Sequence, residues 1–243
     1  MQLFSDFIQL EKKVEERKRA LALRSDVKLS ALFRELFVPR SKKLVTAAEF
    51  QVGLQKIGIS ALNEELFLFM KRYDKDEDGK LRYAEYIEVL APLAEEYFQL
   101  LQNRELERSE KPRGWQGQLP PSTGLTSPES SPRLNKLLDE DSIEALKELM
   151  RCHLDSESSA EVIRQRTMQS KLFEVARAFE VCDLDADGQL SVEDIRQCMK
   201  EAKIYASEKD VELLFRRFGC APRRAISKGA LVSELSPKAP LKF

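Results

Sequence analysis

The sequence predicts an all-α protein of two lobes joined by a Pro/Ser/Gly-rich linker, with extra helices flanking the lobes. Two observations support this prediction. Two twelve-residue acidic loops, at 74–85 and 183–194, each lie between segments whose apolar residues recur at helical spacing. A weaker copy of the loop pattern begins at Val38, 36 residues before Asp74, and another begins at Gly219, 36 residues after Asp183. A repeat at this period is typical of structural units that stack or pair.

The first acidic loop carries oxygen donors at positions 1, 3, 5 and 12, with a glycine at position 6. Several oxygen ligands at short range are what a hard divalent cation requires, and the glycine permits the sharp turn that lets them converge. The alternative, an exposed acidic turn, would not require Gly79 or Leu81 at their positions. The predicted ligands are Asp74, Asp76, Asp78, the backbone carbonyl of Lys80, and Glu85.

The second acidic loop repeats the pattern but ends in aspartate instead of glutamate. Its predicted ligands are Asp183, Asp185, Asp187, the backbone carbonyl of Gln189, and Asp194, and Ser191 could ligate directly or through water. Aspartate is one methylene shorter, so the second loop suits octahedral Mg²⁺ better than the first. We therefore expect the first loop to bind Ca²⁺ more tightly, although Arg82 places a cation beside it.

These loops resemble those of the EF-hand superfamily, which includes calmodulin, troponin C and centrin. The resemblance implies helix–loop–helix units that work in pairs through a short strand at loop position 8, with Ca²⁺ as the cofactor and Mg²⁺ possible, especially at 183–194. It predicts that Val45 pairs with Leu81 and that Leu190 pairs with Ile226. The segments 38–49 and 219–230 are then degenerate hands, because neither carries an acidic residue at position 1, 3 or 5.

The predicted organisation is a first lobe at 1–106, a linker at 107–135 and a second lobe at 136–243. The linker holds five prolines and the lone tryptophan, Trp115, and such a composition cannot bury a core. Amphipathic helices at 4–23 and 141–154 precede the lobes. They could fill the grooves of their own lobes or dock on other proteins. A helix should end before Pro92 and another should follow at 93–101.

Composition excludes several classes of function. The formal net charge is −1, which does not favour nucleic-acid binding. No apolar stretch is long enough for a membrane span, and the first residues lack the apolar region of a signal peptide. We expect the four cysteines (Cys152, Cys182, Cys198 and Cys220) to be free buried thiols. The single histidine, His153, has no evident nucleophile partner, so the sequence favours a protein that is not an enzyme.

A narrower resemblance concerns the surroundings of the loops. The runs Lys71–Asp76, Leu81–Tyr86, Glu16–Arg19, Ile163–Arg166 and Glu234–Lys238 are similar to EF-hand proteins of cilia and flagella. This resemblance implies a structural or interaction component of an axonemal microtubule assembly, in the cytoplasm and at the cilium or flagellum axoneme. Its partners would be axonemal or cytoskeletal proteins, with neither nucleic acid nor membrane. The alternative is a soluble cytoplasmic calcium sensor that binds a target helix or regulates an enzyme.

Overall fold

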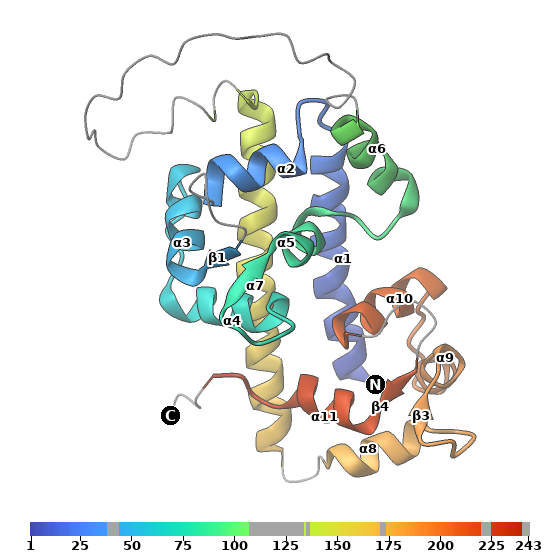
Figure 1. The fold of residues 1–243 in the computed structure, drawn as a ribbon. Coiled ribbons are helices and arrows are strands. Elements are labelled where there is room, and N and C mark those ends of the chain that lie inside the picture. Colours follow the sequence, from blue (N-terminus) through green and yellow to red (C-terminus); the bar gives the residue numbers. More distant parts are fainter. Residues whose placement is uncertain (38–43, 107–133, 135–136, 171–173, 220–224, 240–243) are drawn as a thin grey trace, which may run out of the picture. The chain divides into compact units, whose positions relative to one another are not determined.

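The computed structural model describes residues 1–37, 44–106, 134, 137–170, 174–219 and 225–239. These residues form eleven α-helices, one π-helical turn and four short strands, so the prediction of a mainly helical protein is confirmed (Figure 1). Contacts divide the chain into two units. One comprises Arg17–Arg151, and the other comprises Met1–Glu16 together with Cys152–Phe243.

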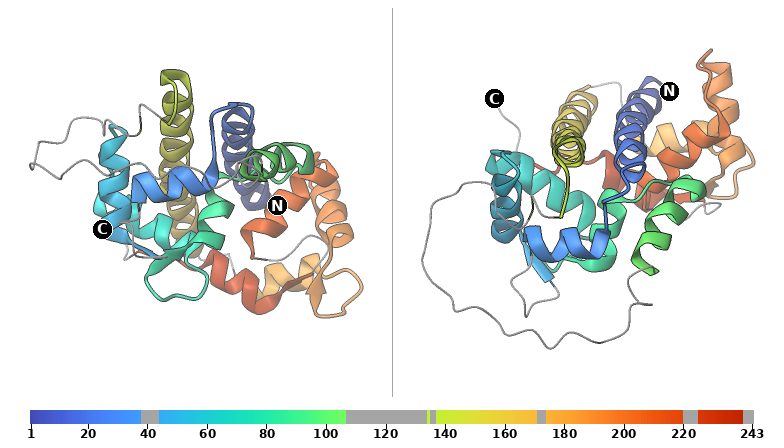
Figure 2. Two further views of the ribbon diagram at one scale, coloured as in Figure 1. Left: turned by 45° about the horizontal axis from the view of Figure 1, so that its top comes forward. Right: turned by 90° about the horizontal axis from the view of Figure 1, so that it is seen from above.

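The unit Arg17–Arg151 holds two helix–loop–helix segments, accompanied by parts of α1 and α7 and by α6. All of its helices except α7 are coloured blue to green in Figures 1 and 2. Its elements are the second part of α1 (Gln2–Ala22), α2 (Leu29–Leu32), the π-helical turn η1 (Phe33–Phe37), β1 (Leu44–Thr46), α3 (Ala47–Lys56), α4 (Asn63–Tyr73), β2 (Lys80–Arg82), α5 (Tyr83–Leu90), α6 (Glu95–Leu106) and the first part of α7 (Glu140–Gln169).

The two short strands of this unit pair antiparallel, with Val45 opposite Leu81 as predicted. Both side chains are buried, so the strand pair belongs to the core as well as joining the two segments. Helix α3 starts at a capping box in which the Thr46 hydroxyl accepts from the Glu49 amide (3.3 Å), and the Glu49 carboxylate accepts from the Thr46 amide (3.0 Å).

A column of aromatic rings fills the core between the helices of this unit. The Phe37 and Phe50 ring centroids lie 4.6 Å apart, and those of Phe50 and Phe69 lie 4.7 Å apart, in stacked geometry. Gly53 allows the Phe37 ring to lie against α3, since a Cβ atom there would lie 2.2 Å from Phe37 Cδ1. Close packing of this kind leaves no room for even one extra methyl group.

Two helix boundaries test the sequence analysis. Helix α5 ends at Leu90, and α6 follows from Glu95, as Pro92 predicts. Helix α7 begins at Glu140, and its N-cap is Asp139, which accepts from the Ser142 amide at 2.7 Å. That bond lowers the pKa of the Asp139 carboxyl. The predicted cap at Asp141 or Ser142 was therefore wrong by two or three residues.

The second unit holds two further helix–loop–helix segments, drawn in orange to red in Figures 1 and 2. Its strands β3 and β4 pair antiparallel with Leu190 opposite Ile226, which confirms the second predicted pairing. Besides parts of α1 and α7, the unit comprises α8 (Val175–Cys182), β3 (Gln189–Leu190), α9 (Val192–Glu201), α10 (Glu208–Arg217), β4 (Ile226–Ser227) and α11 (Lys228–Leu235).

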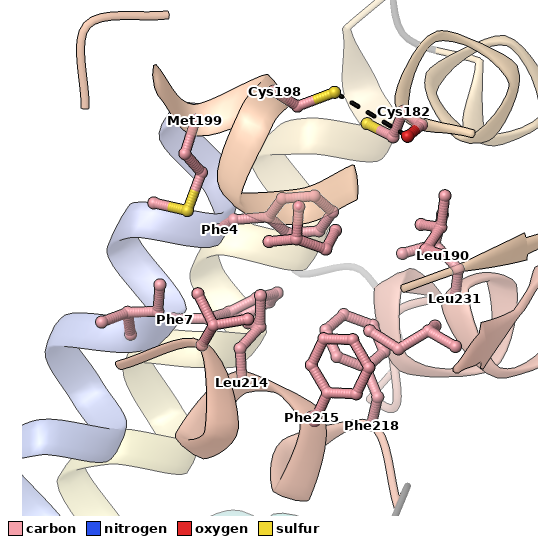
Figure 3. Close-up of a cluster of buried hydrophobic side chains, with 14 of the residues drawn as sticks. Phe4, Phe7, Cys182, Leu190, Cys198, Met199, Leu214, Phe215, Phe218 and Leu231 are labelled. Atoms are coloured by element: carbon pink, nitrogen blue, oxygen red, sulfur yellow. Dashed lines mark hydrogen bonds between the residues drawn. The ribbon is translucent and has the colours of Figure 1, made fainter. Parts of the chain in front are cut away.

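The start of α1 is part of the core of this second unit (Figure 3). Phe4, Phe7 and Ile8 are buried against side chains from α8–α11. Residues 140–151 of α7, in contrast, belong to the unit Arg17–Arg151. The hypothesis that each preceding helix fills the groove of its own lobe is therefore wrong for both of these segments.

The predicted domain boundaries stay predictions, because the linker at 107–135 lies almost entirely outside the described residues. Trp115, the basic part of the segment 38–49, and Cys220 also lie outside them. Cys182 and Cys198 are free and buried, and Cys152 is half-buried. Within the described ranges, every helix is too short or too polar to span a lipid bilayer.

Candidate metal centres

The first acidic loop folds back on the carboxylate of its first residue. Helix α4 ends at Tyr73, and Asp74 Oδ2 accepts from the Gly79 amide at 2.8 Å while Oδ1 accepts from the Asp78 amide at 3.2 Å. Asp78 Oδ1 in turn accepts from the Lys80 amide at 2.9 Å. The turn requires positive φ at Gly79 (76°), a conformation that glycine adopts without strain.

This folding gathers three of the predicted ligands. Asp74, Asp76 and Asp78 each offer a carboxylate oxygen, and these atoms lie within 4.8 Å of one another. Two oxygens bound to one Ca²⁺ lie at most about 5 Å apart, because each Ca–O distance is about 2.3–2.6 Å. The three aspartates are therefore spaced to bind one cation of this size.

Glu85 closes the loop from the opposite end. It lies in the first turn of α5 and is buried, with Oε1 accepting from the Lys75 amide at 2.9 Å and Oε2 accepting from the Arg82 amide at 2.8 Å. Both oxygens thus have backbone partners, and Glu85 is not one of the three clustered carboxylates. Lys80, whose carbonyl was the remaining predicted ligand, lies in β2 opposite Thr46.

A side-chain cation contacts two of the three clustered carboxylates. The Arg82 guanidinium forms an ion pair with Asp76 and a longer one with Asp78, at 3.5 Å. An incoming metal ion must therefore displace an arginine that is tethered to the same loop. The sequence placed Arg82 beside the site, and the structure identifies the carboxylates that it contacts.

The second acidic loop has the same backbone pattern. Asp183 Oδ2 accepts from the Gly188 amide at 3.0 Å, and Asp187 Oδ1 accepts from the Gln189 amide at 2.7 Å. Gly188 has a φ of 83°. One oxygen each from Asp183, Asp185 and Asp187 lies within 4.8 Å of the others. Gln189 lies in β3. The two loops are thus near copies at the level of the hydrogen-bonded backbone.

The two loops differ at positions 9 and 12. Asp194 is buried in the first turn of α9, and its Oδ2 accepts from both the amide (2.8 Å) and the hydroxyl (2.6 Å) of Ser191. The Ser191 hydroxyl also accepts from the Asp194 amide at 3.1 Å. Ser191 therefore acts as the N-cap of α9 and carries no charge, whereas position 9 of the first loop is occupied by Arg82.

The thiol next to the second loop is held in its neutral form by burial. Cys182 immediately precedes Asp183, and burial raises the pKa of its thiol to about 12. The neighbouring Cys198 Sγ lies 3.8 Å from the Cys182 carbonyl oxygen (Figure 3). A thiol with so high a pKa is almost never a thiolate at neutral pH, so it does not compete with the aspartates for a cation.

One charged cluster away from the loops had no sequence signal. Arg164 and Arg217 are fully buried and share the carboxylates of Glu157 and Glu234. Charged residues are almost never fully buried unless paired, so spacing alone assigns them to the surface. Arg164 pairs with Glu161 on its own helix, but the contacts to Glu234 and the contact of Arg217 to Glu157 join residues 17 to 70 positions apart.

No protein-family model matches this chain, and no curated protein matches it either. The assignment of its function therefore depends on the geometry of the two loops and on the sequence pattern.

Proposed function

We propose that this chain is an EF-hand protein that binds about two divalent cations, Ca²⁺ or Mg²⁺, and serves as a structural component of an axonemal assembly. In this proposal it has no enzymatic activity, and its partners are ciliary or cytoskeletal proteins. The observation that supports cation binding is the clustering of three aspartates in each loop, whose carboxylate oxygens lie within 4.8 Å of one another: Asp74, Asp76 and Asp78 in the first loop, and Asp183, Asp185 and Asp187 in the second. The paired strands at position 8 of each loop support the assignment to EF-hand pairs.

Calorimetric titration of the full chain with Ca²⁺ and with Mg²⁺ tests cation binding. We expect two sites, and we expect Asp74→Asn with Asp78→Asn to remove one of them. Glu77→Gln is the matched control, because Glu77 lies in the same loop but is not a predicted ligand, and its side chain pairs with Lys71. More than two sites, no sites, or loss of a site in the control would contradict the proposal.

The axonemal role is supported by the sequence resemblance alone and needs a cellular test. A tagged chain expressed in a ciliated cell should remain with the axoneme after detergent extraction of the membrane. The same chain with both loops neutralised shows whether retention depends on the cation. A uniform cytoplasmic distribution that detergent removes completely would contradict the structural role.

The alternative role, a calcium sensor, is favoured by a hollow of about 460 Å³ beside the first loop. Leu66, Phe67 and Met70 of α4 line it, together with Asp74, and Phe67 is 44 % exposed. An amphipathic helix of a partner could bind such a surface when the loop takes up Ca²⁺.

Fluorescence of a hydrophobic dye distinguishes the two roles. A ligand shifts a conformational equilibrium only by its differential affinity for the two states. With one cation-binding loop in each pair, we expect a small rise on adding Ca²⁺ over Mg²⁺, compared with a sensor that has two such loops per pair. A large rise would support the sensor over the structural component.

A further inference from the structure

The first helical turns of the chain contribute a stripe of large side chains to the core of the unit that contains Cys152–Phe243. Phe4, Phe7 and Ile8 are spaced i, i+3 and i+4, so they lie on one face of α1, and each is at most 5 % exposed. The Phe4 ring meets the Phe218 ring edge-on with centroids 6.2 Å apart (Figure 3). Gln9, on another face of the helix, is exposed.

A carboxylate one turn further along continues the stripe. Glu11 Oε1 lies 2.7 Å from Nη1 of Arg217, whose side chain is 0 % exposed. The Arg217 guanidinium also lies over the Phe7 ring, 4.7 Å from its centroid. Burial alone would lower the pKa of Arg217, but Glu157, Glu234 and Glu11 raise it well above its ordinary value. Arg217 is therefore a permanent cation, and it favours a carboxylate at the position of α1 that Glu11 occupies.

The rest of the unit supplies its own support for this site. Strands β3 and β4 join the two helix–loop–helix segments without α1. Arg217 also pairs with Glu157, at 3.0 Å, and with Glu234, at 2.9 Å, and neither carboxylate belongs to α1. The stripe also leaves an apolar cavity of about 290 Å³ beside Phe4, lined by Val181 and Leu235 among others. Residues 1–16 thus leave part of the space between α8 and α11 unfilled.

We propose that α8–α11, with the part of α7 from Cys152 onward, form a helix-binding groove which residues 1–16 occupy as an intramolecular ligand. The partner that fits this groove is an amphipathic helix with large apolar side chains at i, i+3 and i+4 and a carboxylate at i+7. In the resting chain Phe4, Phe7, Ile8 and Glu11 provide these four groups. Another helix of the same pattern binds only when residues 1–16 leave. This inference does not depend on cation binding by either loop or on an axonemal location.

Binding of a fluorescein-labelled peptide of residues 1–16 to the full chain, followed by anisotropy, tests the proposal. A tethered segment competes at an effective concentration on the order of millimolar, so the wild-type chain should bind the peptide very weakly. Phe7→Ala weakens the tethered segment, and we expect it to bind the wild-type peptide on the order of 100-fold more tightly than the wild-type chain does. Gln9→Ala is the matched control and should behave as the wild type.

A second arm uses the carboxylate. A peptide carrying Glu11→Gln should bind the Phe7→Ala chain about 10-fold more weakly, because it lacks the charged partner of Arg217. Should Phe7→Ala fail to fold, as judged by circular dichroism, Glu11→Gln in the full chain replaces it. That variant keeps the apolar stripe and should bind the wild-type peptide about 10-fold more tightly than the wild-type chain does.

Two outcomes would overturn the proposal. Equal binding of the peptide to the wild-type chain and to the weakened variant would show that residues 1–16 do not block the groove. No binding to a folded variant would show that the segment is an integral part of the core and cannot be exchanged.

Discussion

Replacing Arg82 by serine should raise the Ca²⁺ affinity of the loop 74–85. The Arg82 guanidinium pairs with Asp76 and Asp78, two of the three clustered carboxylates, so it competes with a metal ion for the same oxygens. Serine is the residue that the second loop carries at the equivalent position, Ser191, where it caps a helix without contacting the clustered aspartates.

The size of the effect follows from two contributions. Arg82, Asp76 and Asp78 have side chains that are 56 %, 36 % and 29 % exposed, so each ion pair is a surface pair that contributes about 0.2–1 kcal/mol. A displaced guanidinium about 8 Å from a dication adds a repulsion of roughly 0.5 kcal/mol after screening by salt. Together they give about 1–2 kcal/mol, and hence a Ca²⁺ affinity about 5–30-fold higher in the variant.

The assay is calorimetry on chains in which Asp183→Asn and Asp187→Asn silence the second loop. Lys75→Ser is the matched control, since Lys75 is a cation of the same loop whose ammonium pairs with Glu88 at 2.6 Å and with none of the clustered aspartates. It should change the affinity only about 2-fold, through long-range charge. Equal gains from Arg82→Ser and Lys75→Ser would refute a specific competition, and a weaker site in Arg82→Ser would refute its direction.

Three further predictions concern other parts of the chain. Asp194→Glu should increase the preference of the second loop for Ca²⁺ over Mg²⁺, because a longer carboxylate suits the wider coordination shell of Ca²⁺. The assay is a titration in which Ca²⁺ and Mg²⁺ compete. An unchanged preference would show that position 12 is not a ligand. Gly53→Ala should lower the free energy of unfolding, measured in urea, by about 1–3 kcal/mol, because the new Cβ would meet the Phe37 ring. Gly229→Ala should instead raise it by up to about 1 kcal/mol, because the Cβ there has no neighbour closer than 3.9 Å and alanine favours a helix over glycine. Equal effects of the two alanines would contradict this reasoning. Tyr86→Phe should raise the free energy of unfolding by about 1 kcal/mol, because the buried Tyr86 hydroxyl has no hydrogen-bond partner among the described residues. Burial also raises the pKa of Tyr86 well above 10.0, so the wild-type chain loses stability as the pH rises above about 10, and the phenylalanine variant should lose less of it.

The strand pairs could be predicted because the resemblance to EF-hand loops implies a short strand at loop position 8 that pairs with its counterpart in the neighbouring loop. Once Gly79 and Gly188 place the turns, position 8 follows at a constant distance, and Val45 and Ile226 are the apolar residues at the matching positions. The grouping of three aspartates in each loop follows from the same spacing. The grouping of the aspartates is local to one loop, whereas each strand pair joins two loops.

The length of α7 could not be predicted in the same way. Its apolar pattern supports a helix over 141–154, yet the helix continues to Gln169. Beyond Leu154 the buried side chains include Glu157, Glu161 and Arg164, which lie at i, i+4 and i+7 and form ion pairs. Hydrophobic periodicity counts such residues as exposed, so a buried polar stripe has no signature without the positions of its partners.

The position of residues 1–16 of α1 is specified by a buried charge as well as by an apolar face. An apolar stripe can slide by one turn, about 5.4 Å, and still bury much of its area. On α1 such a slip would place Glu11 and Lys12 where Phe7 and Ile8 are now buried, and it would remove Glu11 from Arg217. Leaving buried charges without partners costs several kcal/mol, far more than a mismatched methyl group. The apolar stripe and the pair of Glu11 and Arg217 therefore specify the same register of α1.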